Sequence, residues 1–117
     1  MKILLVEDEL GIQQVVKAFL QSKDAEVDVT HNGDVAFNMV KDNDYDIVLF
    51  DNNLEGMTGE QAVTAIEKEN IDCKVIVNTA YGIEELKSRL KDSKIVVGFI
   101  AKPFDLKVLW ETIQENL

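Results

Sequence analysis

The chain has 117 residues, of which 46% are hydrophobic and 29% are charged, as expected for a single folded domain. Its formal net charge of −10 argues against direct binding to nucleic acid, because affinity for a phosphate backbone depends on clustered Lys and Arg. The apolar run near the N-terminus is too short for a signal peptide or a membrane span, and the lone Cys73 has no partner for an internal disulfide. We therefore expect one cytoplasmic domain over residues 1–117, with no role at a membrane.

Five short segments have the composition of β-strands. Four are continuous apolar runs rich in β-branched residues, at residues 3–6, 47–50, 75–77 and 96–100. Continuous apolarity predicts strands that are covered on both faces, as in a parallel sheet between two layers of helices. Residues 26–30 alternate between polar and apolar side chains instead, which predicts an edge strand with one face in water.

Between these strands the apolar residues recur with the period of an α-helix. The five stripes consist of Ile12, Val15, Val16, Phe19 and Leu20; Val35, Ala36, Met39 and Val40; Ala62, Ala65 and Ile66; Ile83, Leu86 and Leu90; and Leu106, Leu109, Trp110 and Ile113. Thr58 and Asp105 are well placed to cap the third and fifth helices. Alternating strands and helices with right-handed crossovers predict an α/β fold: a doubly wound, five-stranded parallel sheet of order 2-1-3-4-5 with five helices on both faces, as in flavodoxin-like domains.

Polar residues cluster where the predicted strands end. Glu7 and Asp8 follow the first strand, Asp51 the third and Thr79 the fourth, and Lys102 lies near the end of the fifth. Ligands of such sheets bind beyond the carboxyl ends of the strands, so we expect these side chains to converge. Three carboxylates in one place repel each other, and a hard divalent cation such as Mg²⁺ removes that repulsion. Taken alone, Asp51 is better explained as a turn residue, but four strand ends together favour a site.

Five motifs, in order and spacing, resemble a known family. They are residues 2–9 (KILLVEDE), 45–51 (YDIVLFD), 56–59 (GMTG), 78–82 (NTAYG) and 102–104 (KPF). The chain resembles the receiver domain of two-component response regulators, including the single-domain chemotaxis and sporulation-relay types, over essentially its whole length.

The resemblance implies a role for each residue of the metal and phosphoryl site. Asp51 is the phosphoryl acceptor, Asp8 ligates Mg²⁺ directly, Glu7 acts through water, and Asn53 offers its backbone carbonyl to the metal.

The resemblance also implies a switch. Thr79 and Ala80 belong to the phosphoryl-binding set, Lys102 pairs with the phosphoryl group, and Phe99 is the aromatic residue that turns inward on activation. Asn53 and Tyr81 flank the expected path of the hydrolytic water and therefore tune the lifetime of the phosphorylated state. The Lys102–Pro103 peptide bond is expected to be cis.

The function that follows from this resemblance is Mg²⁺-dependent phosphoryl transfer from a histidine kinase or a phosphotransfer protein to Asp51, which switches a protein-binding face. Such a domain is not a classical enzyme, because it catalyses only its own phosphorylation and slow autodephosphorylation. Its output goes to a downstream protein target or a fused output domain, and the resemblance allows dimerisation on phosphorylation.

Several alternatives to this function remain. The chain is either a stand-alone regulator or a receiver from a longer DNA-binding or enzymatic protein, and a degenerate receiver that binds partners without phosphorylation is a third reading. Two other classes fit less well. A dehalogenase-type phosphatase needs an acid where this chain has Asn53, and a flavodoxin needs a phosphate-binding loop where this chain has acidic residues.

Overall fold

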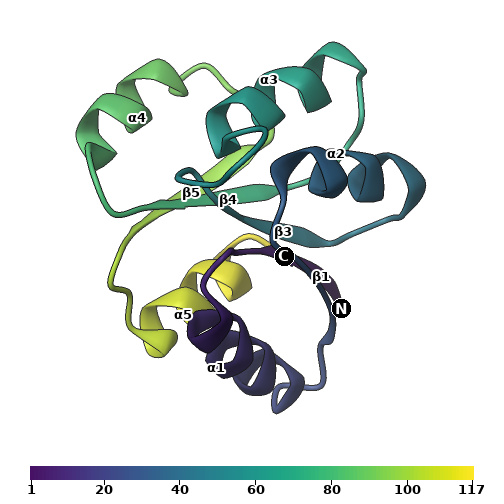
Figure 1. Cartoon of the computed structure of the whole chain (residues 1–117), viewed down its shortest axis with the longest axis vertical. Coiled ribbons are helices and arrows are strands. Elements are labelled where there is room, and N and C mark those ends of the chain that lie inside the picture. Colours follow the sequence, from purple (N-terminus) through teal and green to yellow (C-terminus); the bar gives the residue numbers. More distant parts are fainter.

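The computed structural model describes all of residues 1–117 and consists of five strands that alternate with five helices (Figure 1). The elements are β1 (Lys2–Val6), α1 (Leu10–Gln21), β2 (Glu26–Thr30), α2 (Gly33–Asp42), β3 (Ile47–Asp51), α3 (Gly59–Lys68), β4 (Val75–Thr79), α4 (Ile83–Arg89), β5 (Val96–Ala101) and α5 (Leu106–Glu115). The strands that carry Asp51 and Thr79 are longer than the apolar runs predicted, so both residues end a strand and do not follow one.

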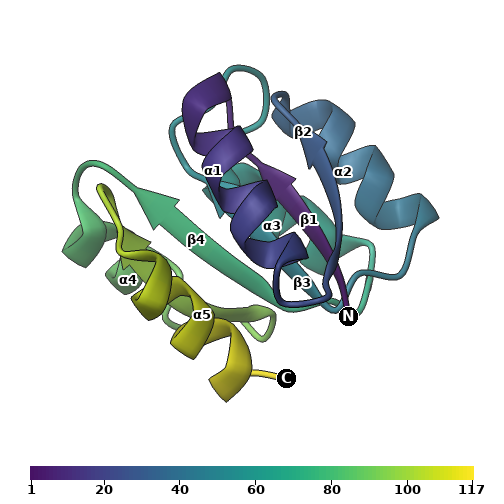
Figure 2. The same ribbon diagram turned by 90° about the horizontal axis from the view of Figure 1, so that it is seen from below.

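The strands form one parallel sheet in the order β2-β1-β3-β4-β5, as the sequence predicts. Helices α1 and α5 cover one face of this sheet, and α2, α3 and α4 cover the other (Figures 1 and 2). The expected doubly wound fold is therefore confirmed, and β2 lies at one edge of the sheet as its alternating sequence indicates. No helix combines the length and the apolar composition that crossing a membrane requires.

Local sequence signals account for where the helices begin. Thr58 and Gln61 form a capping box at the start of α3, in which the Thr58 hydroxyl accepts the Gln61 N–H at 3.2 Å and the Gln61 side chain accepts the Thr58 N–H at 3.0 Å. Asp105 caps α5 by accepting the Lys107 N–H at 2.7 Å. Both predicted caps are confirmed, and Asn32 caps α2 in the same way.

Two hydrophobic clusters fill the two faces of the sheet. The cluster under α2, α3 and α4 contains 17 buried residues, and the cluster under α1 and α5 contains 12. Strands β3 and β4 are buried along their whole length, because each lies inside the sheet with helices on both faces. These rigid central strands carry Asp51 and Thr79 to the same edge of the sheet.

Three side chains or segments are less buried than the sequence predicts. Strand β5 was expected to be covered on both faces, and this is wrong, because β5 is the second edge strand and residues 96–99 are only partly buried. Val15 on α1 and Val35 on α2 lie on the predicted apolar stripes, but they are 56% and 49% exposed. Each lies at the margin of its stripe, where the helix surface curves away from the sheet.

The loop between β3 and α3 rests directly on the first turn of α2. A Cβ atom on Gly33 would lie 1.7 Å from the Met57 carbonyl oxygen, so only glycine permits this approach. Gly56 in the same loop has a φ of 76°, a backbone conformation that favours glycine. The loop that follows Asp51 is therefore held against α2.

Helix α4 is the most weakly anchored helix. It has 7 residues, and Leu86 is the only buried one among them. Its last residue, Arg89, forms an exposed ion pair with Glu60 of α3, in which Nε lies 2.8 and 3.0 Å from the two carboxylate oxygens. This hydrogen-bonded pair raises the pKa of Arg89.

Candidate functional site

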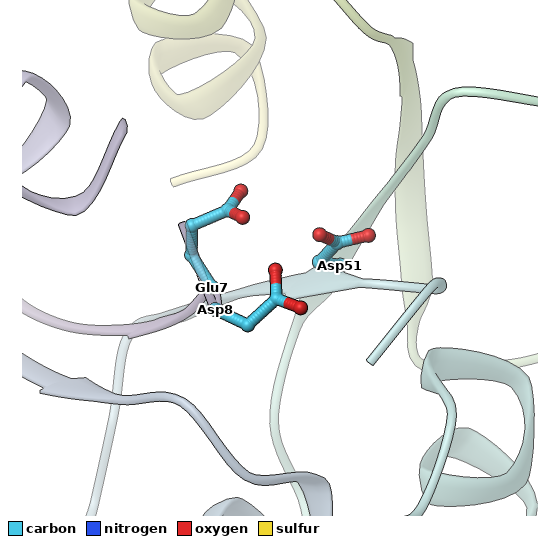
Figure 3. Close-up of side chains that lie close together, drawn as sticks. All are labelled: Glu7, Asp8 and Asp51. Atoms are coloured by element: carbon cyan, nitrogen blue, oxygen red, sulfur yellow. The ribbon is translucent and has the colours of Figure 1, made fainter. Parts of the chain in front are cut away.

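Three carboxylates converge at the carboxyl end of the sheet. Glu7 and Asp8 follow β1 and Asp51 ends the neighbouring strand β3, and one oxygen atom from each lies within 4.8 Å of the others (Figure 3). Glu7 and Asp51 are each 1% exposed, whereas Asp8 is open to solvent. The sequence-based expectation that these three acids come together is met.

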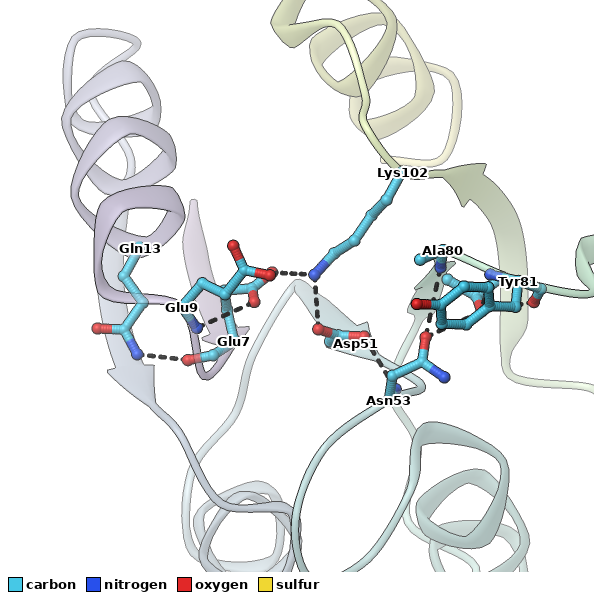
Figure 4. A network of polar contacts seen from close by, with 9 residues as sticks. Glu7, Glu9, Gln13, Asp51, Asn53, Ala80, Tyr81 and Lys102 are labelled. Atoms are coloured by element: carbon cyan, nitrogen blue, oxygen red, sulfur yellow. Dashed lines mark hydrogen bonds and ion pairs between the residues drawn. The ribbon is translucent and has the colours of Figure 1, made fainter.

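Lys102 bridges the two buried carboxylates. Its Nζ lies 2.6 Å from Asp51 Oδ2 and 2.8 Å from Glu7 Oε1 (Figure 4). Burial raises the pKa of Glu7, and hydrogen bonds from Lys102 and the Glu9 N–H only partly oppose this. Burial by itself would lower the pKa of Lys102, but hydrogen bonds to Asp51 and Glu7 outweigh it, so the pKa rises and the amine stays charged.

The second oxygen of Asp51 faces a neutral network. Asp51 Oδ1 accepts the backbone N–H of Asn53 at 2.9 Å. The Asn53 side-chain oxygen lies 3.1 Å from Thr79 Oγ1 and accepts the Ala80 N–H at 3.3 Å (Figure 4). The loop after Asp51 is thereby tied to the end of β4, so one residue, Asn53, connects the carboxylate with the strand that carries Thr79.

Thr79 is buried, and its hydroxyl group has polar neighbours in both Asn53 and Tyr81. The hydroxyl lies 3.1 Å from Asn53 Oδ1 and 2.8 Å from the Tyr81 carbonyl oxygen, and it accepts the Tyr81 N–H at 3.2 Å. It makes no hydrogen bond with Asp51. In this state of the protein Thr79 is therefore oriented toward the loop after β4, and the ring of Tyr81 is 78% exposed at the mouth of the site.

Phe99 lies outside the site, in the middle of β5. It is paired with Val77 of β4, two residues before Thr79, and packs half-buried against the larger hydrophobic cluster.

Two contacts at the site were not expected from the sequence. Gln13, in the first turns of α1, donates its side-chain N–H to the backbone carbonyl of Glu7, and the Glu9 N–H donates to Glu7 Oε2 at 3.2 Å (Figure 4). The only sequence signal was a polar residue on α1 next to the apolar stripe, which is equally typical of a solvated helix face.

The donor atoms of the site fit a Mg²⁺ ion. Mg²⁺ prefers oxygen ligands, retains water molecules and takes few protein carboxylates. Here one exposed and two buried carboxylates stand together with a single, partly buried amine, so negative charge is in excess in the site. The exposed Asp8 leaves space for water in a coordination shell.

Comparison with known proteins points to one family. The family model described as "Response regulator receiver domain" matches residues 3–114. The chain is 28% identical over 116 residues to sporulation initiation phosphotransferase F of Bacillus subtilis, which covers 99% of this chain and 93% of that protein. It is 31% identical to the regulatory protein VanRB of Enterococcus faecalis over 99% of this chain, which spans 52% of that protein.

Solved structures give the same result. The response regulator TrrA of Thermotoga maritima, in complex with Mg²⁺ and BeF, superposes with a TM-score of 0.85 at 31% identity, over 99% of this chain and 98% of that one. The chemotaxis response regulator CheY4 of Vibrio cholerae superposes with a TM-score of 0.88 at 28% identity, again over 99% and 98% of the two chains.

Proposed function

The chain belongs to the response regulator receiver domain family, and from that premise we propose that it is the phosphoacceptor module of a two-component phosphorelay. The acceptor is Asp51, and residues 1–117 act as one receiver in the cytoplasm. The observation that carries the proposal is the position of Asp51, a buried carboxylate at a strand end with Lys102 on one oxygen and acidic neighbours within 4.8 Å.

The reaction is an in-line displacement at phosphorus. A carboxylate oxygen of Asp51 forms a new O–P bond while the bond to the donor breaks, and the bonding electron pair leaves with a histidine imidazole or a small carboxylate donor. Lys102, already 2.6 Å from Asp51, offsets charge on the phosphoryl oxygens. Asp8, Asp51 and the Asn53 carbonyl, with Glu7 acting through water, would hold a Mg²⁺ ion, and the ion would supply further positive charge to these oxygens.

The phosphorylated state is lost when water attacks the acyl phosphate and releases inorganic phosphate. Asn53 lies next to Asp51 and Tyr81 lies at the exposed mouth of the site, so these two side chains control how water reaches the phosphorus. We assign them the tuning of the phosphoryl lifetime.

The switch begins at Thr79. A phosphoryl group adds about −1.5 to −2 of charge at Asp51 and strong acceptor oxygens, which draw the Thr79 hydroxyl and the Ala80 N–H away from Asn53. Moving a two-state population from 1:99 to 99:1 takes about 5.5 kcal/mol. Hydrogen bonds to charged groups contribute about 1.5–3 kcal/mol each, so two new bonds contribute about 3–6 kcal/mol, a range that includes this energy. Phe99 then fills the space beside Thr79.

The partner that delivers the phosphoryl group is a histidine kinase or a phosphotransfer protein. A groove of about 610 Å³ opens beside the site and is lined mainly by apolar residues of α1 and of the segment after β5. The apolar lining residues are Ile12, Val15, Val16, Ala80, Pro103, Phe104 and Leu106. The groove supports docking of a donor helix next to Asp51, and it explains why Val15 is apolar but exposed.

Intact mass spectrometry after incubation with acetyl phosphate and Mg²⁺ tests the acceptor. We expect the wild type to gain the mass of one phosphoryl group and Asp51→Ala to gain none. Asp92→Ala, which removes an exposed aspartate outside the site, serves as the matched control and should be phosphorylated normally. A wild type that gains no phosphoryl mass, from acetyl phosphate or from a kinase, identifies a degenerate receiver and overturns the proposal.

Thermal unfolding with and without Mg²⁺ tests the metal separately. A ligand that binds only the folded state at 100 times its Kd stabilises it by about 2.7 kcal/mol. We expect Mg²⁺ to raise the Tm of the wild type and of Glu9→Gln, but not of Asp8→Asn. Glu9 is the control because it is adjacent to Asp8 and lies outside the carboxylate cluster. Equal responses of the two variants would exclude the proposed ligand set.

A further inference from the structure

The peptide bond between Glu7 and Asp8 lies just beyond the end of a β-ladder. The Glu7 N–H still donates to the Thr30 carbonyl of β2 at 3.0 Å, so the chain is held up to this point. The Glu7 carbonyl oxygen accepts no backbone N–H, and the Gln13 side chain is its only hydrogen-bond partner. The peptide that joins the two acids is therefore fixed by α1 and not by the sheet.

Helix α1 is a rigid support for this contact. Val16 and Leu20, on the same helix, are 2% and 0% exposed in the cluster under α1 and α5. The Gln13 backbone N–H donates to the Glu9 carbonyl at 3.0 Å, so the same residue closes the first turn of the helix over the acidic loop. The acidic loop is thus held in place by a well-packed helix.

Asp8 depends on this support more than the other two carboxylates do. Glu7 is held by Lys102 and by the Glu9 N–H, and Asp51 is held by Lys102 and by the Asn53 N–H. The Asp8 carboxylate accepts no hydrogen bond from any protein group and is exposed. Its orientation is set only by its backbone, which follows directly after the carbonyl that Gln13 holds.

We propose that Gln13 is a positioning residue for the metal site: its amide fixes the Glu7–Asp8 peptide, so that Asp8 is preorganised to bind a divalent cation. This inference rests on the proposed function of the carboxylate cluster. Losing the partner that orients a metal ligand commonly weakens metal affinity about 10-fold to 100-fold. Because Gln13 acts on a backbone carbonyl and not on a carboxylate, we expect the lower end of that range.

The test compares two neighbouring glutamines on one helix. Gln13→Met removes the donor at nearly constant side-chain length, and Gln13→Ala removes the side chain. Gln14→Met is the matched control, because Gln14 is exposed and makes no side-chain hydrogen bond. Met and Ala are both strong helix formers, so α1 is retained in all three variants. Mg²⁺ affinity is measured by isothermal titration calorimetry, and amide hydrogen exchange at Asp8 and Glu9 is measured by NMR on metal-free protein.

We expect Gln13→Met and Gln13→Ala to raise the Kd for Mg²⁺ about tenfold and to speed amide exchange in the acidic loop, with Gln14→Met within twofold of the wild type. A Gln13→Met protein that binds Mg²⁺ as the wild type does would overturn the inference and leave the proposed function intact. A wild type that binds no Mg²⁺ would overturn both.

Discussion

The site has two halves that differ in how they are held together, and Asp51 stands between them. The charged half consists of Glu7, Asp8 and Lys102, and the partly buried Lys102 amine lies 2.6 Å from Asp51 and 2.8 Å from Glu7. The neutral half consists of Asn53, Thr79, Ala80 and Tyr81, which are joined by amide and hydroxyl hydrogen bonds of 2.8–3.3 Å.

The two kinds of contact have different energies. A buried ion pair is costly to break, about 3–5 kcal/mol when one partner is removed, whereas a neutral hydrogen bond contributes about 0.5–1.5 kcal/mol. The charged half is therefore suited to hold metal and phosphoryl groups without moving. The neutral half is suited to exchange its partners, and exchange of partners at Thr79 is the first event of the proposed switch.

Replacing Lys102 breaks the charged half and has the largest expected effect. In metal-free buffer at pH 8 we expect Lys102→Met to lower the free energy of unfolding by about 3–5 kcal/mol, because Glu7 and Asp51 stay buried without a counter-charge. Lys107→Met, on the exposed side of α5, is the control and should change it little. Urea unfolding measures both.

The pH dependence of that loss follows from the two raised pKa values. The pKa of Lys102 is raised, so the amine is charged throughout pH 5 to 8 and its own titration adds no pH dependence to stability in that range. The raised pKa of Glu7 means that its protonated form favours folding, and stability falls as pH rises through that value. Without Lys102 this pKa rises further, so the deficit should shrink toward pH 5. A deficit that does not change with pH would contradict this account.

Two glycine-to-alanine changes compare the segments that support the two halves, which are the loop after β3 for the neutral half and α1 for the charged half. We expect Gly33→Ala to destabilise the protein by about 1–3 kcal/mol, because the new methyl group collides with the Met57 carbonyl and displaces the loop that carries Asn53. Gly11→Ala, in α1 under the charged half, has open space and should stabilise it by about 0.5–1 kcal/mol. Thermal unfolding measures both changes in stability, and a Gly33→Ala protein as stable as the wild type would refute the close approach at Gly33.

Replacing Thr79 tests whether phosphorylation of Asp51 can occur without the movement of Phe99. Thr79→Val keeps the shape but removes the hydroxyl, which should cost about 1–2 kcal/mol of stability because the Tyr81 N–H loses its partner and Asn53 Oδ1 keeps only the Ala80 N–H. Phosphorylation from acetyl phosphate should persist, whereas the NMR shift of the Phe99 ring on phosphorylation should disappear. Thr64→Val, on the exposed side of α3, is the control. A Phe99 shift that survives in Thr79→Val would place the switch elsewhere.

The last expected effect concerns the lifetime of the phosphorylated state. Asn53→Ala and Tyr81→Ala should each change the dephosphorylation rate by up to about tenfold, or about 1.4 kcal/mol, because they alter access of water to the phosphorus. The rate is followed by loss of phosphoryl mass after the donor is removed. Wild-type rates in both variants would remove the proposed tuning role of the neutral half.

Local sequence signals predict much of the fold and of the site. Apolar runs, helical stripes and the caps at Thr58 and Asp105 are short-range patterns, and they predict the strand order once right-handed crossovers are assumed. The carboxylates converge because parallel strands end at one edge of the sheet. The convergence of Glu7, Asp8 and Asp51 therefore follows from the topology.

The features that were not predicted depend on contacts between distant segments. The approach of Met57 to Gly33 and the exposure of Val15 are set by how neighbouring helices and loops pack, which no local pattern reports. The partial burial of β5 follows from its place at the edge of the sheet, because an apolar edge strand and an apolar central strand have the same composition. Gln13 is one polar residue among several on α1.

The weak anchoring of α4 has a consequence for how the proposed phosphorylation of Asp51 would change the surface of the protein. Surface ion pairs such as Arg89–Glu60 contribute little to stability, and salt screens them, so Leu86 is the main restraint on this helix. Trypsin should therefore cut first after Lys87 or Arg89, and sooner at high ionic strength. Because few buried contacts hold α4, we expect a small rearrangement at the end of β4 to reshape this outer surface while both hydrophobic clusters stay intact.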